Sequence, residues 1–271
     1  MEEEKVFELT KENYHSPEAR KRYLGASMFK DFQKCEVMAL AKVNGEYEEK
    51  QTPALLFGSY VDAYFSNELP EFIANHPELF TKQGTLKSDY KGAEEVIKAI
   101  EADPVFMKYM SGEKQVIMTG VINGVPTKIK MDSYHPHKVI VDQKVMKDLE
   151  PVWIDSSTGG RVLVDFVEAY RYDIQGALYQ EVERQNSGEQ LPFVLAVATK
   201  EECPDKLVMR IDQEFLDLAL AEYKEKAPRY WDIINGKIEP IGCGHCPACR
   251  SKKMLDERIP TYKKFREKEI N

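Results

Sequence analysis

The sequence has no apolar run approaching the length of a membrane-spanning helix. Its N-terminus, MEEEKVFELT, lacks the basic start and the apolar segment of a signal peptide. These absences predict a cytoplasmic protein with no membrane partner. Cysteine is scarce, and in a reducing compartment the five cysteines are expected to be thiols or metal ligands rather than disulfides. Excess positive charge is also missing. A net charge of −8 argues against a protein that coats nucleic acid by bulk attraction, but it allows one that grips DNA in a local groove.

The 271 residues, 42% of them hydrophobic, are enough for one large domain or two small ones. Neither an internal repeat nor a low-complexity tract divides the chain. We expect a single domain over residues 1–271, with a helical N-terminal part (1–112), a core (113–235), and a C-terminal part (236–271) that holds a cysteine motif and a basic tail.

The central feature of the sequence is the stretch from Pro126 to Lys147, PTKIKMDSYHPHKVIVDQKVMK. Residues 127–131 alternate polar and apolar side chains, as a half-buried strand does, and Asp132 ends that strand. The proline in residues 134–137 predicts a turn. The β-branched residues 139–141 predict a second strand that is buried on both faces.

Asp142 and Lys144 are two residues apart on the second strand, so they share one face. Burying an unpaired charge is costly, which favours a hydrophilic site at this point. Carboxylates on adjacent strands can hold a divalent metal through oxygen, and a neighbouring lysine can orient water or steady a phosphate. This combination of metal-binding carboxylates and a lysine suits metal-assisted phosphodiester hydrolysis. A hairpin with surface charges is the simpler alternative, because so short a pattern is common.

Two helices are expected before the hairpin. The first, residues 27–43, has Ser27 as a plausible N-cap, and Cys35 lies on or beside its apolar stripe, where a small buried core residue is the default interpretation. The second, Pro53–Phe65, is apolar apart from Asp62. A lone acid in such a helix usually caps, pairs with a cation or binds metal.

After the hairpin, residues 162–184 have the periodicity of one long helix. Gln175 and Tyr179 lie four residues apart and are therefore neighbours on one face of it. Taken alone, that pair predicts no more than a surface or core position. Strands are predicted at residues 114–120, 191–199 and 207–211, the first leading into an Asn123–Gly124 turn. A helix is predicted at residues 213–231.

The C-terminal part contains IGCGHCPACR, in which Cys243, Cys246 and Cys249 are separated by two residues each. Three of five cysteines in such a short stretch indicate metal or cluster ligation. The fourth ligand is open among His245, Cys35 and Cys203. A basic tail follows residue 250 and predicts contact with DNA or a partner, or else a solvated face.

Taken together, these motifs resemble the PD-(D/E)XK nucleases, and more closely the phage and prophage relatives of exonuclease VIII, the RecE-type enzymes. The similarity runs from about residue 9 to about residue 253. It is carried by the hairpin with Asp132 and DQK at 142–144, and by these segments: FKDFQKCEVMALAK, ALLFGSYVDAYF, YDIQGALY and CGHCPACR.

The resemblance implies an α/β fold with a mixed sheet flanked by helices, and Mg²⁺ or Mn²⁺ at the hairpin. Asp132, Asp142 and the main-chain carbonyl of Gln143 would be metal ligands, and Lys144 would assist the attacking water. Two further roles follow from the same resemblance: Gln175 and Tyr179 would support the site and contact DNA, and Asp62 would be an additional metal ligand. The sequence departs from the family pattern at Asp62, where a histidine is usual, and at Gln143, where a small or apolar residue is commoner.

The function implied is a metal-dependent exonuclease that degrades linear double-stranded DNA, 5′ to 3′, in phage-type recombination. Its expected partners are DNA ends, a single-strand annealing protein and further copies of the chain in a ring. A non-catalytic DNA-binding recombination accessory protein on the same fold is the alternative. A zinc-binding scaffold built around the C-terminal cysteines is a third possibility.

The resemblance also selects the fourth thiol. The segment SMFKDFQKCE is similar to the N-terminal cysteine segment of iron–sulfur nucleases, whose other three cysteines follow the nuclease core. Cys35, Cys243, Cys246 and Cys249 are therefore expected to bind a [4Fe-4S] cluster that links the two ends of the chain. Cys203 lies among carboxylates that disfavour a thiolate. Tetrahedral Zn²⁺ on the same three C-terminal cysteines, with Cys35 or His245, is the alternative.

Overall fold

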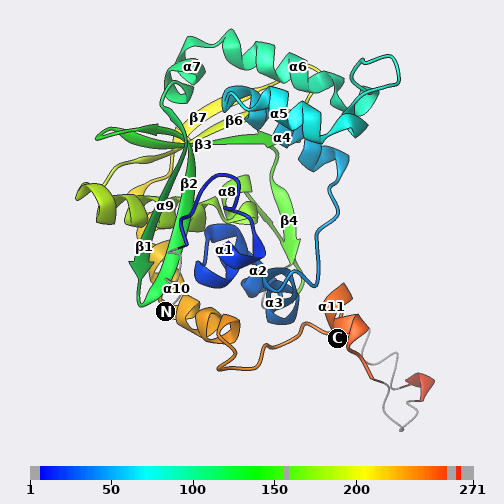
Figure 1. Ribbon diagram of the computed structural model, residues 1–271, viewed down its shortest axis with the longest axis vertical. Helices are drawn as coiled ribbons and strands as arrows, with labels where there is room; N and C mark the ends of the chain where they lie inside the picture. Colours follow the sequence, from blue (N-terminus) through cyan, green and yellow to red (C-terminus); the bar gives the residue numbers. More distant parts are fainter. Residues whose placement is uncertain (1–6, 156–158, 255–260, 264–271) are drawn as a thin grey trace, which may run out of the picture.

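A mixed five-stranded sheet with helices on both faces forms the centre of the protein, as the computed structural model in Figure 1 shows. The structure describes residues 7–155, 159–254 and 261–263. Most of the predicted basic tail lies outside these residues. Within them, no helix is both long enough and apolar enough to cross a bilayer.

The strands are β1 (Glu113–Ile122), β2 (Val125–His135), β3 (Val139–Met146), β4 (Val152–Asp155), β5 (Arg161–Val164), β6 (Phe193–Thr199) and β7 (Lys206–Arg210). The helices are α1 (Pro17–Arg22), α2 (Ala26–Lys34), α3 (Glu36–Val43), α4 (Pro53–Phe65), α5 (Leu69–Asn75), the short 3₁₀ helix Pro77–Leu79, α6 (Ser88–Glu101), α7 (Pro104–Met110), α8 (Phe166–Tyr170), α9 (Tyr172–Ser187), α10 (Gln213–Ile234) and α11 (Pro247–Ser251).

The sheet has the strand order β1-β2-β3-β6-β7. Three of its pairings are antiparallel, and β3 with β6 is parallel. The parallel pair requires a crossover, which here consists of the β4–β5 ribbon followed by α8 and α9. This arrangement confirms the predicted mixed sheet flanked by helices.

Two apolar cores cover the two faces of the sheet. Helices α2, α3, α9 and α10 pack on one face around residues such as Phe193 and Ile140. Helices α4, α6 and α7 pack on the other, against Val141 and Val194. Because β3 contributes to both cores, it is buried on both faces, as its β-branched sequence predicted.

The predicted hairpin is present as β2 and β3, although β2 continues for three residues beyond Asp132. The Asn123–Gly124 turn is also confirmed, because both residues have the positive φ that a tight hairpin turn demands. The predicted helix Pro53–Phe65 is α4, and the proline at its first position is compatible with a helix start.

The prediction of one helix over residues 27–43 was wrong. The chain leaves the helix at Cys35, which is extended with φ −167° and ψ 113°, and a new helix begins at Glu36. Ser27 is not the N-cap either, since Gly25 holds that position without a side-chain bond. The break separates α2 from α3 at a residue whose thiol belongs to the four-cysteine group.

The prediction of one helix over residues 162–184 was also wrong. Residues 161–164 pair with β4 instead, as their β-branched side chains allow. Asp165 then caps α8, accepting hydrogen bonds from the N–H groups of Val167 and Glu168. Arg171 takes a left-handed conformation, with φ 53°, and redirects the chain into α9.

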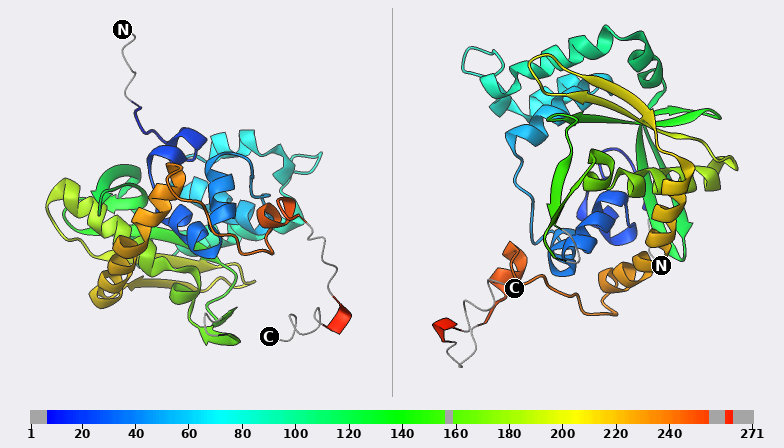
Figure 2. Two further views of the ribbon diagram at one scale, coloured as in Figure 1. Left: turned by 90° about the horizontal axis from the view of Figure 1, so that it is seen from below. Right: turned by 180° about the vertical axis from the view of Figure 1, so that it is seen from behind.

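The C-terminal segment lies beside α3. Helix α11 contacts α3, and the views in Figures 1 and 2 agree on this placement. Glu36 holds the C-terminal segment there, because its carboxylate accepts hydrogen bonds from Arg229 and from the N–H of Ile241. The thiol of Cys35 is thereby brought to the C-terminal cysteines.

Candidate active site

The candidate active site begins where β2 and β3 separate. Their pairing covers Ser133 to His135 opposite Val139 to Val141 and then stops. The next pair in this register would be Asp132 with Asp142. Instead, the Asp132 carboxylate enters the gap, where its Oδ2 accepts a hydrogen bond of 2.8 Å from the Gln143 N–H. The result is a fork in the sheet with one carboxylate on each arm.

Helix α9 holds one side of this fork. Gln175 Nε2 donates to Asp142 Oδ1 at 2.6 Å, and it also lies 3.2 Å from the Tyr179 hydroxyl, which donates to the Lys130 carbonyl. The helix comes this close to the sheet because Gly176 has no side chain. A Cβ there would lie 2.5 Å from the ring of Phe193 on β6. The predicted pair on α9 thus faces the carboxylates rather than solvent.

Lys144 provides the counter-charge. Its Nζ lies 2.5 Å from Asp142 Oδ2, and it also lies over the Tyr172 ring, 5.3 Å from the centroid. Burial favours the neutral amine, but Asp142 and Asp132 outweigh burial and raise the pKa of Lys144. The lysine is therefore a fixed cation at neutral pH.

The other carboxylates lack such a partner. Burial, followed by repulsion from Asp142 and Asp62, raises the pKa of Asp132 well above its usual range. Burial likewise raises the pKa of Asp62, whose carboxylate has no hydrogen bond or ion pair with any residue that the structure describes. The carboxylates of Asp62, Asp132 and Asp142 thus have less positive charge beside them than negative charge. Such a set of oxygen ligands suits a hard divalent cation such as Mg²⁺.

Asp62 lies on α4 and lines the same cavity as Asp132 and Asp142. The three carboxylates do not converge on one point. In the described part of the chain, only the four cysteines form a group of ligand atoms that all lie within 4.8 Å of one another. The side chain of Asp62 would have to move toward the fork to share an ion with the other two.

The cavity itself has a volume of about 910 Å³ and is also lined by a basic group, Arg20, Lys128 and Lys130, which surrounds His15. Burial, reinforced by these three cations, lowers the pKa of His15 to about 4, so His15 itself is neutral at pH 7. Within the described residues, no carboxylate forms an ion pair with Arg20, Lys128 or Lys130. The basic group therefore has charge available for an anion.

Sequence reasoning missed this basic group and also missed Lys30. No pattern in the sequence singled out Arg20 or its neighbour His15. Lys30 on α2 lies over the same Tyr172 ring as Lys144, with its Nζ 5.6 Å from the ring centroid. Burial and the proximity of Lys144 lower the pKa of Lys30 to about 8.

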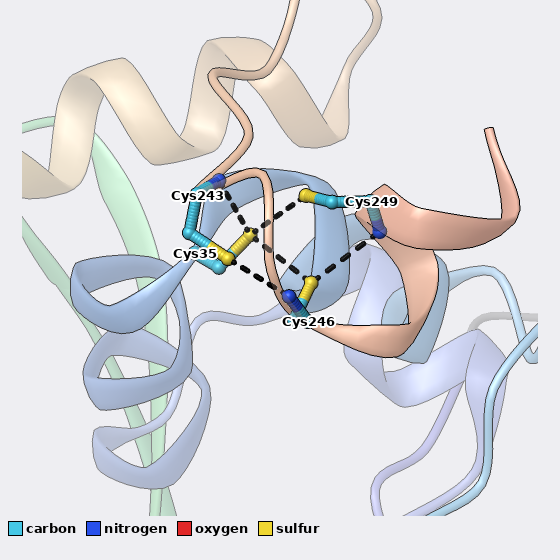
Figure 3. Close-up of side chains that lie close together, drawn as sticks. All are labelled: Cys35, Cys243, Cys246 and Cys249. Atoms are coloured by element: carbon cyan, nitrogen blue, oxygen red, sulfur yellow. Dashed lines mark hydrogen bonds between the residues drawn. The ribbon is translucent and has the colours of Figure 1, made fainter. Parts of the chain in front are cut away.

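The four predicted cysteines form a second site, shown in Figure 3. Cys35 Sγ lies 3.7 Å from Cys246 Sγ and 3.6 Å from Cys249 Sγ. Main-chain N–H groups donate to the thiols, and those of His245 and Cys246 lower the pKa of Cys243 to about 6. This eases formation of the thiolate that a metal requires.

The two other candidates for the fourth ligand, Cys203 and His245, are outside this group of four cysteines. Cys203 is exposed, and the Nδ1 of His245 lies 3.0 Å from the Cys243 carbonyl oxygen. Four sulfurs at the corners of a tetrahedron around Zn²⁺, with Zn–S bonds of about 2.3 Å, would be about 3.8 Å apart. The two distances from Cys35, 3.6 and 3.7 Å, and the 4.8 Å within which all four sulfurs lie suit a single tetrahedral ion. A cubane of iron and sulfide between the thiols needs them farther apart.

Comparison with known proteins agrees with this geometry. Residues 25–252 match the family described as "PDDEXK-like domain of unknown function (DUF3799)". The chain is also similar to a solved crystal structure from Eubacterium rectale, described as a "putative exonuclease", with a TM-score of 0.87 and 46% sequence identity. The alignment covers 94% of this chain and 97% of the other. No curated protein matches the chain.

Proposed function

Since the chain belongs to the PDDEXK-like family DUF3799, and with it to the PD-(D/E)XK nuclease superfamily, we propose that it is a metal-dependent exodeoxyribonuclease acting on linear duplex DNA. The observation that carries this proposal is the fork of β2 and β3. There Asp132, Asp142 and Lys144 line a cavity that is also lined by the basic group Arg20, Lys128 and Lys130. The family and the similar solved structure support nuclease activity, while the exonuclease mode and the DNA substrate are the proposal.

The metal ligands in this proposal are the carboxylates of Asp132 and Asp142 and the main-chain carbonyl of Gln143, with Asp62 as an additional ligand. Mg²⁺ or Mn²⁺ bound there would act as a Lewis acid on the scissile phosphate and lower the pKa of a bound water. The oxygen-only ligand set supports these ions rather than a soft metal.

The remaining side chains have positioning and charge-stabilising roles. Lys144, fixed as a cation by Asp142 and the Tyr172 ring, would orient the attacking water and offset the charge that develops on the phosphate. Gln175 would keep Asp142 in place, and Tyr179 would tie Gln175 to β2. Both residues also line the cavity and so would contact DNA.

The basic group in the cavity supports binding of a nucleic acid backbone. Arg20, Lys128 and Lys130 carry positive charge without carboxylate partners in the described chain, and they line the same cavity as the carboxylates. Phosphates are the natural counter-ions for such a group. This local groove reconciles DNA binding with a net charge of −8.

Several finer features rest on the resemblance to RecE-type enzymes alone. They are digestion from 5′ to 3′, cooperation with a single-strand annealing protein, assembly into a ring, a role in phage-type recombination and a cytoplasmic location. The non-catalytic DNA-binding accessory protein is the alternative, and the retention of Asp132, Asp142 and Lys144 favours the enzyme. A single domain over residues 1–271 also remains part of the proposal.

For the cysteine centre we propose one structural metal site that joins α2 and α3 to the C-terminal segment. The sulfur spacing favours tetrahedral Zn²⁺. The [4Fe-4S] cluster predicted from the sequence is the alternative, and it requires the four thiols to separate. Metal content distinguishes them: about one zinc in colourless protein, or about four irons in brown protein.

The proposed activity predicts the outcome of one digestion experiment. With Mg²⁺, end-labelled linear duplex should be degraded progressively while covalently closed circular duplex stays intact, because an exonuclease needs an end. EDTA should stop the reaction. Placing the label at the 5′ or the 3′ terminus gives the direction, since the first label released marks the end attacked.

Binding of linear duplex without any cleavage would favour the accessory protein. Cleavage of the circle at a comparable rate would contradict the exonuclease mode while leaving the nuclease assignment in place.

A further inference from the structure

Gln115 combines an unfavourable backbone conformation with a buried side chain beside the carboxylates. Its φ is 53°, in the left-handed region that glutamine rarely adopts. The other described non-glycine residues with positive φ lie in turns or at helix ends, whereas Gln115 lies inside β1. Such conformations persist where the surroundings impose them, and they are concentrated at functional sites.

The position of Gln115 in the sheet explains its positive φ. The β1–β2 register runs from Lys114 opposite Ser133 to Val116 opposite Met131, and it omits the pair between them, Gln115 with Asp132. Asp132 thus has an interrupted pairing on both sides, with Gln115 across from it on β1 and Asp142 across from it on β3. The row from Gln115 to Asp142 crosses the sheet at the fork.

The side chain of Gln115 is 2% exposed and reaches two partners. Its Nε2 donates to Ser66 Oγ at 2.8 Å and to Asp132 Oδ1 at 3.3 Å. Ser66 is the C-cap of α4, and its N–H donates to the main-chain carbonyl of Asp62. One amide group therefore links the helix that carries Asp62 to the strand that carries Asp132.

The remaining atom of the amide has no protein partner. Gln115 Oε1 is buried and accepts no hydrogen bond from any residue in the described ranges. Leaving a buried acceptor unpaired is unfavourable. An unpaired polar atom in such a position therefore indicates either local strain or a hydrogen-bond donor on a bound ligand. Gln115 is not among the residues that line the cavity, so its unpaired Oε1 is a further cost of holding the amide against Asp132.

We propose that Gln115 is a positioning residue for the divalent metal site: its Nε2 holds Asp132 in the orientation that binds the ion. This inference rests on the proposed function, because it presupposes that the carboxylates bind a divalent cation. It assigns to Gln115 no contact with the reacting atoms. Partners that orient metal ligands typically change metal affinity by about 10- to 100-fold when they are replaced.

The Gln115→Asn substitution separates this role from a purely structural one. Asparagine keeps the amide and tolerates a positive φ better than glutamine, so the folded backbone should not be weakened. Its side chain is one methylene shorter and cannot reach both Ser66 and Asp132. We expect Mn²⁺ affinity, measured by isothermal titration calorimetry, to fall roughly 10-fold or more, with an unchanged or higher melting temperature of the metal-free protein.

Gln185→Asn provides the matched control. Gln185 on α9 also binds β1, where its amide pairs with the N–H and carbonyl of Val121, far along the strand from Gln115. The control variant loses hydrogen bonds to the same strand, and we expect its Mn²⁺ affinity to equal that of the wild type.

Three outcomes would overturn the inference. Wild-type Mn²⁺ affinity in Gln115→Asn, together with normal digestion of linear DNA, would refute the role of Gln115 and leave the nuclease proposal standing. If Gln185→Asn loses as much Mn²⁺ affinity as Gln115→Asn, or if the melting temperature of Gln115→Asn is lowered, then Gln115 has only a structural role. Failure of the wild-type protein both to bind Mn²⁺ and to cleave DNA would remove the proposed function and this inference together.

Discussion

Digestion of linear DNA should fall by at least about a hundredfold in the Asp142→Asn variant, as expected when a group that stabilises transition-state charge is lost. Asp142 is 2% exposed, and its two oxygens hold Gln175 and Lys144. Asparagine has the same shape, so the packing should be kept, while the loss of the charge that pairs with Lys144 should lower stability. It removes the negative charge that binds the metal and balances the buried lysine. A single-turnover assay with Mg²⁺ measures the loss.

Asp148→Asn is the control for this variant. Asp148 follows the same strand, pairs with Lys147 and is not among the residues that line the cavity. Its removal should leave the digestion rate within about twofold of the wild type, because surface ion pairs contribute little. Near-normal digestion by Asp142→Asn would contradict the assignment of the fork as the active site.

The Cys35→Ser variant should lose its bound metal and much of its stability. Cys35 would provide the one ligand from the N-terminal half of the chain, 208 residues before Cys243. Cross-linking residues so far apart constrains the unfolded chain by about 5 kcal/mol in the loop-entropy model. We therefore expect several kcal/mol less free energy of unfolding in urea, and less than one tenth of the wild-type metal content by elemental analysis.

Cys203→Ser tests the specificity of that effect, because Cys203 is an exposed thiol outside the cysteine group. Metal content and unfolding free energy should match those of the wild type. Full metal occupancy in Cys35→Ser would show that the three C-terminal cysteines suffice, and it would contradict the role of Cys35 in joining the ends of the chain.

The hairpin and its carboxylates were predictable because their signals are local. Alternating residues, a turn and a β-branched run define β2 and β3, and the period of two places Asp142 and Lys144 on one face. The same applies to Gln175 and Tyr179, whose spacing of four sets them side by side on a helix. Their approach to Asp142 depends on Gly176, a packing effect that periodicity cannot show.

What the sequence did not reveal depends on contacts between distant segments. The break at Cys35 falls within a continuous apolar stripe, and it makes sense only where the C-terminal cysteines meet it. No sequence pattern predicts the positive φ of Gln115, because glutamine rarely adopts that conformation. His15 and Arg20 are separated in sequence from Lys128 and Lys130, and only the fold brings them together in the lining of one cavity.

The central claim is that the fork of β2 and β3 binds a divalent metal ion, and anomalous scattering from crystals containing Mn²⁺ tests it most directly. We predict a peak between the carboxylates of Asp132 and Asp142 and the main-chain carbonyl of Gln143, with oxygen ligands at about 2.1 Å, the distance typical of Mg²⁺ sites. Asp62 should have moved toward it. A Mn²⁺-containing crystal with no peak at the fork, or with Mn²⁺ bound only elsewhere, would contradict the claim.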